Sequence, residues 1–208
     1  QPMDIVVTPD GQKAYVATKG GGIRIIDIAS DAVVNSIGGV SDCHSMIITP
    51  DGQFLYVSEA DWSGTRVWKI EIASNSIVNT IVGLNNPHSM AITKDGSTMY
   101  VANKNNNDIK VIDVATNIII STISDPAFTT GSGPWGITLS PDDEYAYVSI
   151  AWGSPAYTII ETATGIVVAT FDVPGDDGFE MTIPYNSWIT AAPNSGTVPP
   201  GGDTTITV

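Results

Sequence analysis

Leucine and cysteine are nearly absent from this sequence of 208 residues, which has three leucines and one cysteine. No stretch approaches the roughly 18 consecutive apolar residues that a membrane-spanning helix needs. Ile, Val and Thr instead supply 68 of the residues, and their β-branched side chains favour strands over helices. Twenty glycines and thirteen prolines add frequent turns. The composition therefore argues against long helices, coiled coils and disorder.

Basic residues are missing from the second half of the chain. No lysine or arginine follows Lys110, whereas eleven acidic residues lie between positions 111 and 208, and the net charge of the chain is −14. Such a chain repels phosphate groups, which argues against nucleic acid and anionic membranes as partners. Few basic residues with abundant Thr, Ser, Asn and Gly are typical of secreted and cell-surface β-proteins. Cys43 has no partner for an internal disulfide, and we expect a small buried side chain there.

The chain contains a repeat of four units. Each unit carries a turn signature of the type TPDG, and the aspartates of successive turns are separated by 41, 44 and 47 residues. These aspartates are Asp10, Asp51, Asp95 and Asp142. A second signature, YVAT, YVSE, YVAN or YVSI, follows each turn and begins at Tyr15, Tyr56, Tyr100 and Tyr147. Repetition on this scale points to stacked copies of one structural unit.

Each unit reads as four short strands, in the first unit Ile5–Thr8, the YV segment, Ile23–Ile28 and 32–37. In the second strand, Tyr15 and Ala17 would point to one face of a sheet, and Ala14 and Val16 to the other. Both faces are therefore apolar, and only stacking against further copies buries them. Four-stranded units that repeat every 40–45 residues or so are typical of a β-propeller. We predict an all-β fold, a propeller of four-stranded antiparallel blades over residues 1–171.

The repeats resemble the YVTN family of β-propeller repeats, which occurs in archaeal and bacterial surface-layer and secreted proteins. The residues that match the family pattern are Pro87–Met90, Thr93–Gly96, Tyr100–Asn103 and Val111–Thr116. The resemblance covers residues 2 to about 171, and it implies a fold and an extracellular or cell-surface location but no reaction. Family propellers usually close with about seven blades, and this sequence contains four. The four blades either close by themselves, belong to a larger ring, or form an open arc whose ends another chain covers.

After Phe171 the repeat ends, and the tail 172–208 has a different character. Its segments from Trp188–Thr190 to Asp203–Val208 resemble part of an immunoglobulin-like module. A complete module needs about 80 to 100 residues, so these strands cannot bury a core of their own. Either the chain was trimmed within the module, or the tail pairs with a neighbouring subunit by strand addition. The candidate assembly residues are Trp188, Ile189, Ile206 and Val208.

Two histidines, His44 and His88, occupy the same position in successive repeats, and Trp135 fills it in the fourth. Propeller geometry places this position at the start of the innermost strand, near the central channel. Together with Cys43, the histidines raise the question of a transition-metal site. We expect equivalent positions of adjacent blades to be too far apart for one ion, so no metal site is predicted. Packing around the channel is the leading interpretation, and contact with a ligand in the channel is the alternative.

Acidic residues recur once in each unit, in register with the repeat: Asp27, Glu71, Asp113 and Glu161. Such a residue is expected to be structural and to accept backbone N–H groups. Acidic residues also cluster at 142–144 and 172–177, where carboxylates could hold Ca²⁺. The spaced aspartates of a calcium-binding loop are missing there, so we expect solvated turns.

Trp62 and Trp152 fall in the loops between the second and third strands of their units. Aromatic side chains on exposed loops bind sugars or partner proteins, or else pack over a neighbouring blade. The sequence has no nucleophile elbow, phosphate-binding loop or dinucleotide fingerprint, and we predict no catalytic residues and no cofactor.

The sequence favours a non-enzymatic extracellular structural protein, a subunit of a surface layer, sheath or filament. We expect it to self-associate into a polymer or lattice through blade faces and tail strands. The first alternative is a cell-surface module that binds a glycan or a protein. The second alternative is a fragment of a propeller enzyme, either lactonase-like or an oxidoreductase.

Overall fold

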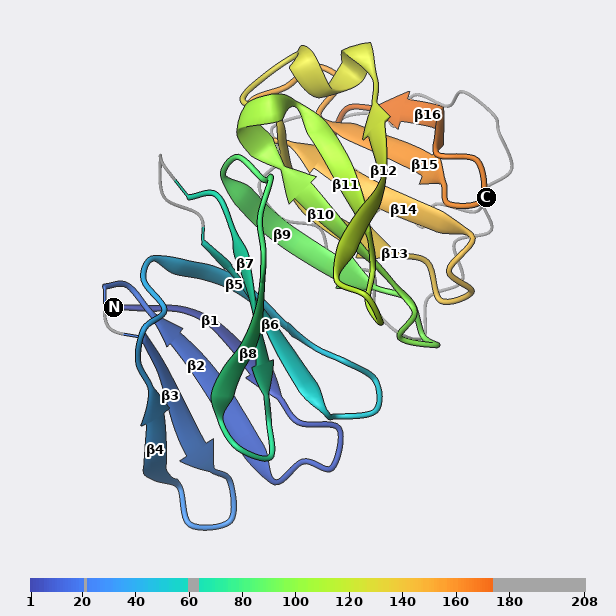
Figure 1. The fold of residues 1–208 in the computed structure, drawn as a ribbon. Helices are drawn as coiled ribbons and strands as arrows, with labels where there is room; N and C mark the ends of the chain where they lie inside the picture. Colours follow the sequence, from blue (N-terminus) through green and yellow to red (C-terminus); the bar gives the residue numbers. More distant parts are fainter. Residues whose placement is uncertain (21, 60–63, 174–208) are drawn as a thin grey trace, which may run out of the picture.

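The computed structural model describes residues 1–20, 22–59 and 64–173, and these form sixteen β-strands and two short 3₁₀ helices (Figure 1). The strands make four separate sheets of four antiparallel strands each, and strands adjacent in sequence are adjacent in the sheet. We call these sheets blades 1 to 4. The prediction of an all-β fold with four-stranded antiparallel units is confirmed. In the described ranges, no helix is long and apolar enough to cross a membrane.

The blades follow one another along the chain. Blade 1 contains β1 (Pro2–Val7), β2 (Lys13–Thr18), β3 (Gly22–Asp27) and β4 (Ala32–Ile37). Blade 2 contains β5 (Cys43–Ile48), β6 (Phe54–Glu59), β7 (Val67–Glu71) and β8 (Ser76–Ile81). Blade 3 contains β9 (Pro87–Ile92), β10 (Thr98–Asn103), the 3₁₀ helix η1 (Lys104–Asn106), β11 (Asp108–Asp113) and β12 (Ile118–Ser124). After η2 (Pro126–Thr129), blade 4 contains β13 (Pro134–Leu139), β14 (Tyr145–Ile150), β15 (Tyr157–Glu161) and β16 (Ile166–Phe171).

The TPDG signature forms the turn between the first and second strands of each blade. In blade 1, the Thr8 hydroxyl donates to Asp10 Oδ1 at 2.6 Å, and the Gln12 N–H donates to the same oxygen at 3.0 Å. These bonds favour the charged carboxylate and lower the pKa of Asp10. Gly11 closes the turn at a φ of 70°, and in blade 4 Asp143 takes the same role at a φ of 63°.

The recurring acidic residues close the turn between the third and fourth strands. Asp113 Oδ1 accepts the Thr116 N–H at 2.7 Å and the Thr116 hydroxyl at 2.6 Å. Asp27 does the same with Ser30, while Glu71 and Glu161 accept only a hydroxyl. The structural role predicted for these acidic residues is therefore confirmed, with backbone N–H groups as partners for the two aspartates.

Three hydrophobic clusters lie between successive blades and form the core. The first joins residues such as Tyr15 and Ile25 of blade 1 to Leu55 and Trp68 of blade 2. The other two join blade 2 to blade 3 and blade 3 to blade 4 in the same manner. We call the face of a blade that meets the preceding blade its leading face, and the opposite one its trailing face.

The tyrosine of the YV segment also makes a polar contact with the next blade. The Tyr15 hydroxyl donates to Asn75 Oδ1 at 3.0 Å, and the Tyr56 hydroxyl donates to Asn117 Oδ1 at 2.9 Å. Both asparagines lie at φ values above 50° in the turns before the outermost strands. Asparagine accepts this backbone conformation and also supplies the acceptor, so one residue fixes both the turn and the spacing of the blades.

The four blades form an open arc in the described part of the chain. The first strands of the blades lie innermost, and β1 packs on β5, β5 on β9, and β9 on β13. The described residues show no comparable packing between β13 and β1, and blades 1 and 4 lie at opposite ends of the molecule (Figure 1). Of the three arrangements that the sequence allows, closure of these four blades among themselves is the one that the structure does not adopt.

Candidate functional site

The innermost strands bring together three aromatic side chains from three blades. His44, His88 and Trp135 are the second residues of β5, β9 and β13. The ring centroids of His44 and His88 are 3.7 Å apart, and those of His88 and Trp135 are 3.8 Å apart. The expectation that equivalent positions of adjacent blades lie too far apart for one ion is therefore wrong for these two histidines, because the inner strands of neighbouring blades converge. We call these three residues the ring column.

The ring column does not have the form of a metal site. The two imidazoles are in van der Waals contact through their rings, with planes tilted by 56°. Cys43 belongs to the core between blades 1 and 2, where burial raises the pKa of its thiol to about 11. A metal-bound cysteine is a thiolate, so this thiol is a poor ligand. Among the described residues, no group of three or more His, Cys, Asp or Glu side chains is placed to hold an ion.

Burial keeps both histidines of the ring column neutral. His88 is 4% exposed, and desolvation, with smaller contributions from the charges of His44 and Lys104, lowers its pKa to about 2. The pKa of His44 is also lowered, mainly by desolvation and then by Lys104. A general base works best when its pKa lies near the working pH. His88 is therefore poorly suited to acid–base catalysis at neutral pH.

Loops of blades 3 and 4 extend the ring column toward solvent. The Lys104 ammonium lies 4.5 Å from the centroid of the Trp135 ring, which is a favourable cation–π distance. The Trp152 ring meets Trp135 edge-on, with centroids 6.1 Å apart. Trp152 lies in the turn between β14 and β15, and its side chain is 58% exposed. The sequence-based placement of Trp152 on an exposed loop is correct, although its contact with Trp135 could not be inferred from spacing.

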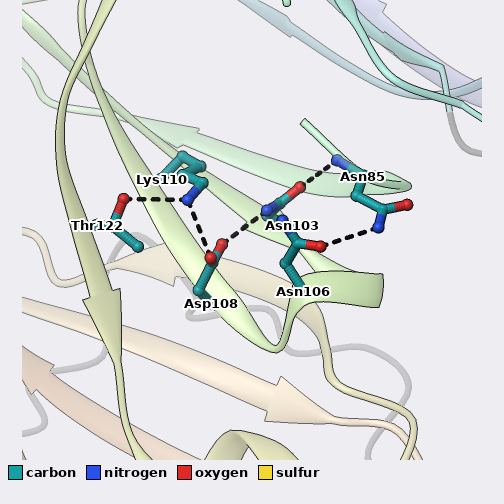
Figure 2. A network of polar contacts seen from close by, with 6 residues as sticks. All are labelled: Asn85, Asn103, Asn106, Asp108, Lys110 and Thr122. Carbon is teal, nitrogen blue, oxygen red and sulfur yellow. Dashed lines mark hydrogen bonds and ion pairs between the residues drawn. The ribbon is translucent and has the colours of Figure 1, made fainter. Parts of the chain in front are cut away.

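A polar network fixes the loop that carries Lys104 (Figure 2). Buried Asn103 donates to Asp108 Oδ1 at 2.7 Å and accepts the backbone N–H of Asn85 at 2.6 Å. Lys110 pairs with Asp108 Oδ2 at 2.9 Å and also donates to Thr122. The sequence analysis missed this network, although the asparagine-rich run 103–107 was a visible signal.

The leading face of blade 1 is an exposed apolar surface. Ile5 on β1 is 59% exposed, whereas Met46, Met90 and Ile137 at the same position of the later repeats are each 5% exposed. Val7 lies on the same face of β1 as Ile5 and is 52% exposed. Monomeric proteins rarely leave contiguous apolar surface of this kind open, so the face is a candidate interaction site.

Several residues singled out from the sequence cannot be placed. Trp62 and the tail residues Trp188, Ile189, Ile206 and Val208 lie outside the described residues.

The acidic group at 142–144 is described, and two of its carboxylates accept hydrogen bonds from turn residues. Asp142 accepts the Ser140 hydroxyl and the Glu144 N–H, and Asp143 accepts the Lys94 N–H.

Two solved structures resemble this arrangement of blades. One is the Kuenenia stuttgartiensis hydrazine synthase, with a TM-score of 0.73 over 83% of this chain and 25% sequence identity. The other is a functionally unknown protein from Desulfotomaculum acetoxidans DSM 771, with a TM-score of 0.74 over 88% of the chain and 17% identity. Residues 35–119 match the model of a family described as lactonase, 7-bladed beta-propeller. The fold is that of a β-propeller.

The relatives of this propeller are distant and longer. The matched regions cover 49% of the hydrazine synthase chain and 60% of the Desulfotomaculum chain. The family match covers less than half of the sequence, so it shows a similarity to lactonase-type propellers and does not assign the chain to that family. No curated protein matches the sequence.

Proposed function

We propose that this chain is a structural module, an arc of propeller blades that is completed by packing another blade against the leading face of blade 1. The proposal carries forward the sequence-based prediction of a non-enzymatic protein that assembles through blade faces. The extracellular location, the surface-layer role, the YVTN kinship and strand addition by the tail remain predictions from the sequence.

The exposure of Ile5 is the observation that carries the proposal. The same repeat position is buried wherever a blade precedes it, and blade 1 alone presents it to solvent in the described structure. The three interfaces between the blades indicate what kind of surface would pack on blade 1. We expect an apolar sheet face like the trailing face of blade 1, which carries Tyr15 and Ile25. An interface of this kind is stabilised mainly by the burial of apolar surface.

The assembly proposal predicts that the purified chain associates with itself through this face when no other blade is supplied. Light scattering coupled to size-exclusion chromatography should give a mass that rises above 21.8 kDa with concentration. The Ile5→Lys variant should stay near the monomer mass, because a buried ammonium strongly disfavours the interface. Ile118 on β12 has the same 59% exposure, and Ile118→Lys is the matched control that should still associate. A wild-type chain that stays monomeric at high concentration would contradict the proposal.

A propeller enzyme is the second candidate, favoured by the match of residues 35–119 to the lactonase family model. The convergence of His44 and His88 at the inner strands also fits a catalytic channel better than the sequence alone suggested. The low pKa of His88 counts against it as a general base. Both a structural module and an enzyme could contain an arc of blades, so a measurement of lactone hydrolysis separates them.

A titration of acid release from δ-gluconolactone separates the two candidates. The structural proposal predicts the same rate with and without the protein. Acceleration that is lost in His44→Ala, and kept in the matched exposed-site variant Ile118→Ala, would favour the enzyme. Because the lactone hydrolyses spontaneously, the rate without protein is the baseline.

A further inference from the structure

Three segments of blades 3 and 4 meet on the side of the molecule where the inner strands of the blades begin. The loop with η1 is held by the Lys104 N–H, which donates to the Asn86 carbonyl at 3.2 Å. The segment before β13 joins the turn at Trp152, because the Ser132 N–H donates to the Ala151 carbonyl at 2.8 Å. We propose that the surface formed by the η1 loop, the segment before β13 and the turn at Trp152 is a binding site for a neutral saccharide. The indole of Trp152 would be the face on which the sugar packs.

Trp152 is held in an unfavourable backbone conformation. Its φ is 54°, in the left-handed region that bulky residues rarely enter. Tight packing maintains this turn, since a Cβ atom on Gly131 would collide with the backbone of Ala151–Gly153. Backbone strain of this kind persists where the surroundings enforce it, and it clusters at functional sites. Here it presents a large apolar ring, 58% exposed, to solvent.

The Trp152 ring is supported by Trp135, and exposed amides lie on the η1 loop, whose Lys104 contacts Trp135. The Trp135 ring meets the Trp152 ring edge-on and is itself packed between blades, so the exposed ring has a firm base. Asn105 and Asn106 on η1 are exposed, and the Asn85 amide donates to Asn106 Oδ1 at 2.9 Å and thereby orients it.

An exposed indole face and the exposed amides of the neighbouring η1 loop suit the chemistry of a sugar ring. The C–H groups on one side of a β-linked hexose pack on an indole, while its hydroxyls exchange hydrogen bonds with amides. The net charge of −14 disfavours acidic glycans through long-range repulsion. A proline-rich peptide needs an aromatic-lined groove. A cavity of about 250 Å³ lies between β9 and β13 and is lined by Lys94, Pro141 and Asp143. It opens near the TPDG turns, at the opposite end of the strands from Trp152, so it is not part of the proposed site.

Isothermal titration calorimetry with cellohexaose and chitohexaose tests the site. We expect the intact chain to bind at least one of the two, with quenching of tryptophan fluorescence, and Trp152→Ala to lower the affinity about tenfold or more. Trp152→Phe should retain most of the affinity. Ile120 on β12 is 60% exposed, and Ile120→Ala is the matched control that should bind like the wild type.

The result is separable from the assembly proposal, because Ile5→Lys should leave saccharide binding unchanged. The inference is overturned if neither hexasaccharide binds, or if Trp152→Ala binds as tightly as the wild type while its circular dichroism shows a native fold. Binding of a proline-rich peptide in place of both saccharides would equally overturn it.

Discussion

Replacing Ile137 by alanine is expected to lower the free energy of unfolding by about 3 kcal/mol, whereas Ile5→Ala should cost less than about 1 kcal/mol. The two isoleucines occupy the same position of the repeat, on the inner strands of blades 4 and 1. Ile137 is 5% exposed in the core between blades 3 and 4, and Ile5 is 59% exposed. Removal of the buried side chain leaves a cavity, while removal of the exposed one loses little burial.

Urea unfolding of the dilute, monomeric chain measures this difference. Both variants lose the same atoms from the same kind of strand, so differences in β-propensity largely cancel. Equal costs at the two positions would mean that the leading face of blade 1 is covered in solution. That outcome would remove the basis of the open arc and of the proposed assembly surface.

Lowering the pH from 7 to 5 is expected to destabilise the protein by about 2 kcal/mol through His88 alone. The pKa of His88 is about 2 in the folded chain and 6.5 without the fold. Between these values the unfolded chain binds a proton that the folded chain excludes, so stability is lost as the pH falls below 6.5. His44, whose pKa is also lowered, adds to the same trend.

His88→Phe should remove most of this pH dependence while keeping an aromatic ring against Trp135. The carboxylates of the TPDG turns have lowered pKa values, so the stability that they add is lost mainly when the pH falls below their unfolded value of 3.8. They therefore add little pH dependence between 7 and 5, and the same in both proteins. Free energies of unfolding at pH 7, 6 and 5 for both chains make the comparison. Identical slopes would show that His88 is accessible to protons in the folded state, contrary to its burial in the ring column.

The local structure was largely predictable from the sequence, because its causes are local. The last strand of the first unit, 32–37, was predicted with the bounds that the structure shows. The turns before the outermost strands contain Asp31, Asn75 and Gly165, which all adopt positive φ, as residue types that favour turns do. Proline and glycine restrict the backbone within a single turn, so these features need no knowledge of the rest of the fold.

The candidate site was predictable only in part. Repeat register identified His44, His88 and Trp135 as equivalent residues, but it could not supply the distances among them. Those depend on how far neighbouring blades rotate about the arc, which no single repeat encodes. The contacts of Trp135 with Trp152 and Lys104 join a strand to two different loops, and for that reason they were missed.

The sequence by itself determined the all-β class, the number of blades, their turns and the two apolar faces of each sheet, because hydrophobic alternation and turn chemistry act within a few residues. Only the tertiary structure decided that the arc stays open at blade 1 and that two histidines lie in contact as neutral rings. It alone also showed the strained, exposed turn at Trp152. The first two features arise from packing between blades, whose equivalent residues lie more than forty positions apart. The turn at Trp152 depends on its contacts with Gly131 and Trp135.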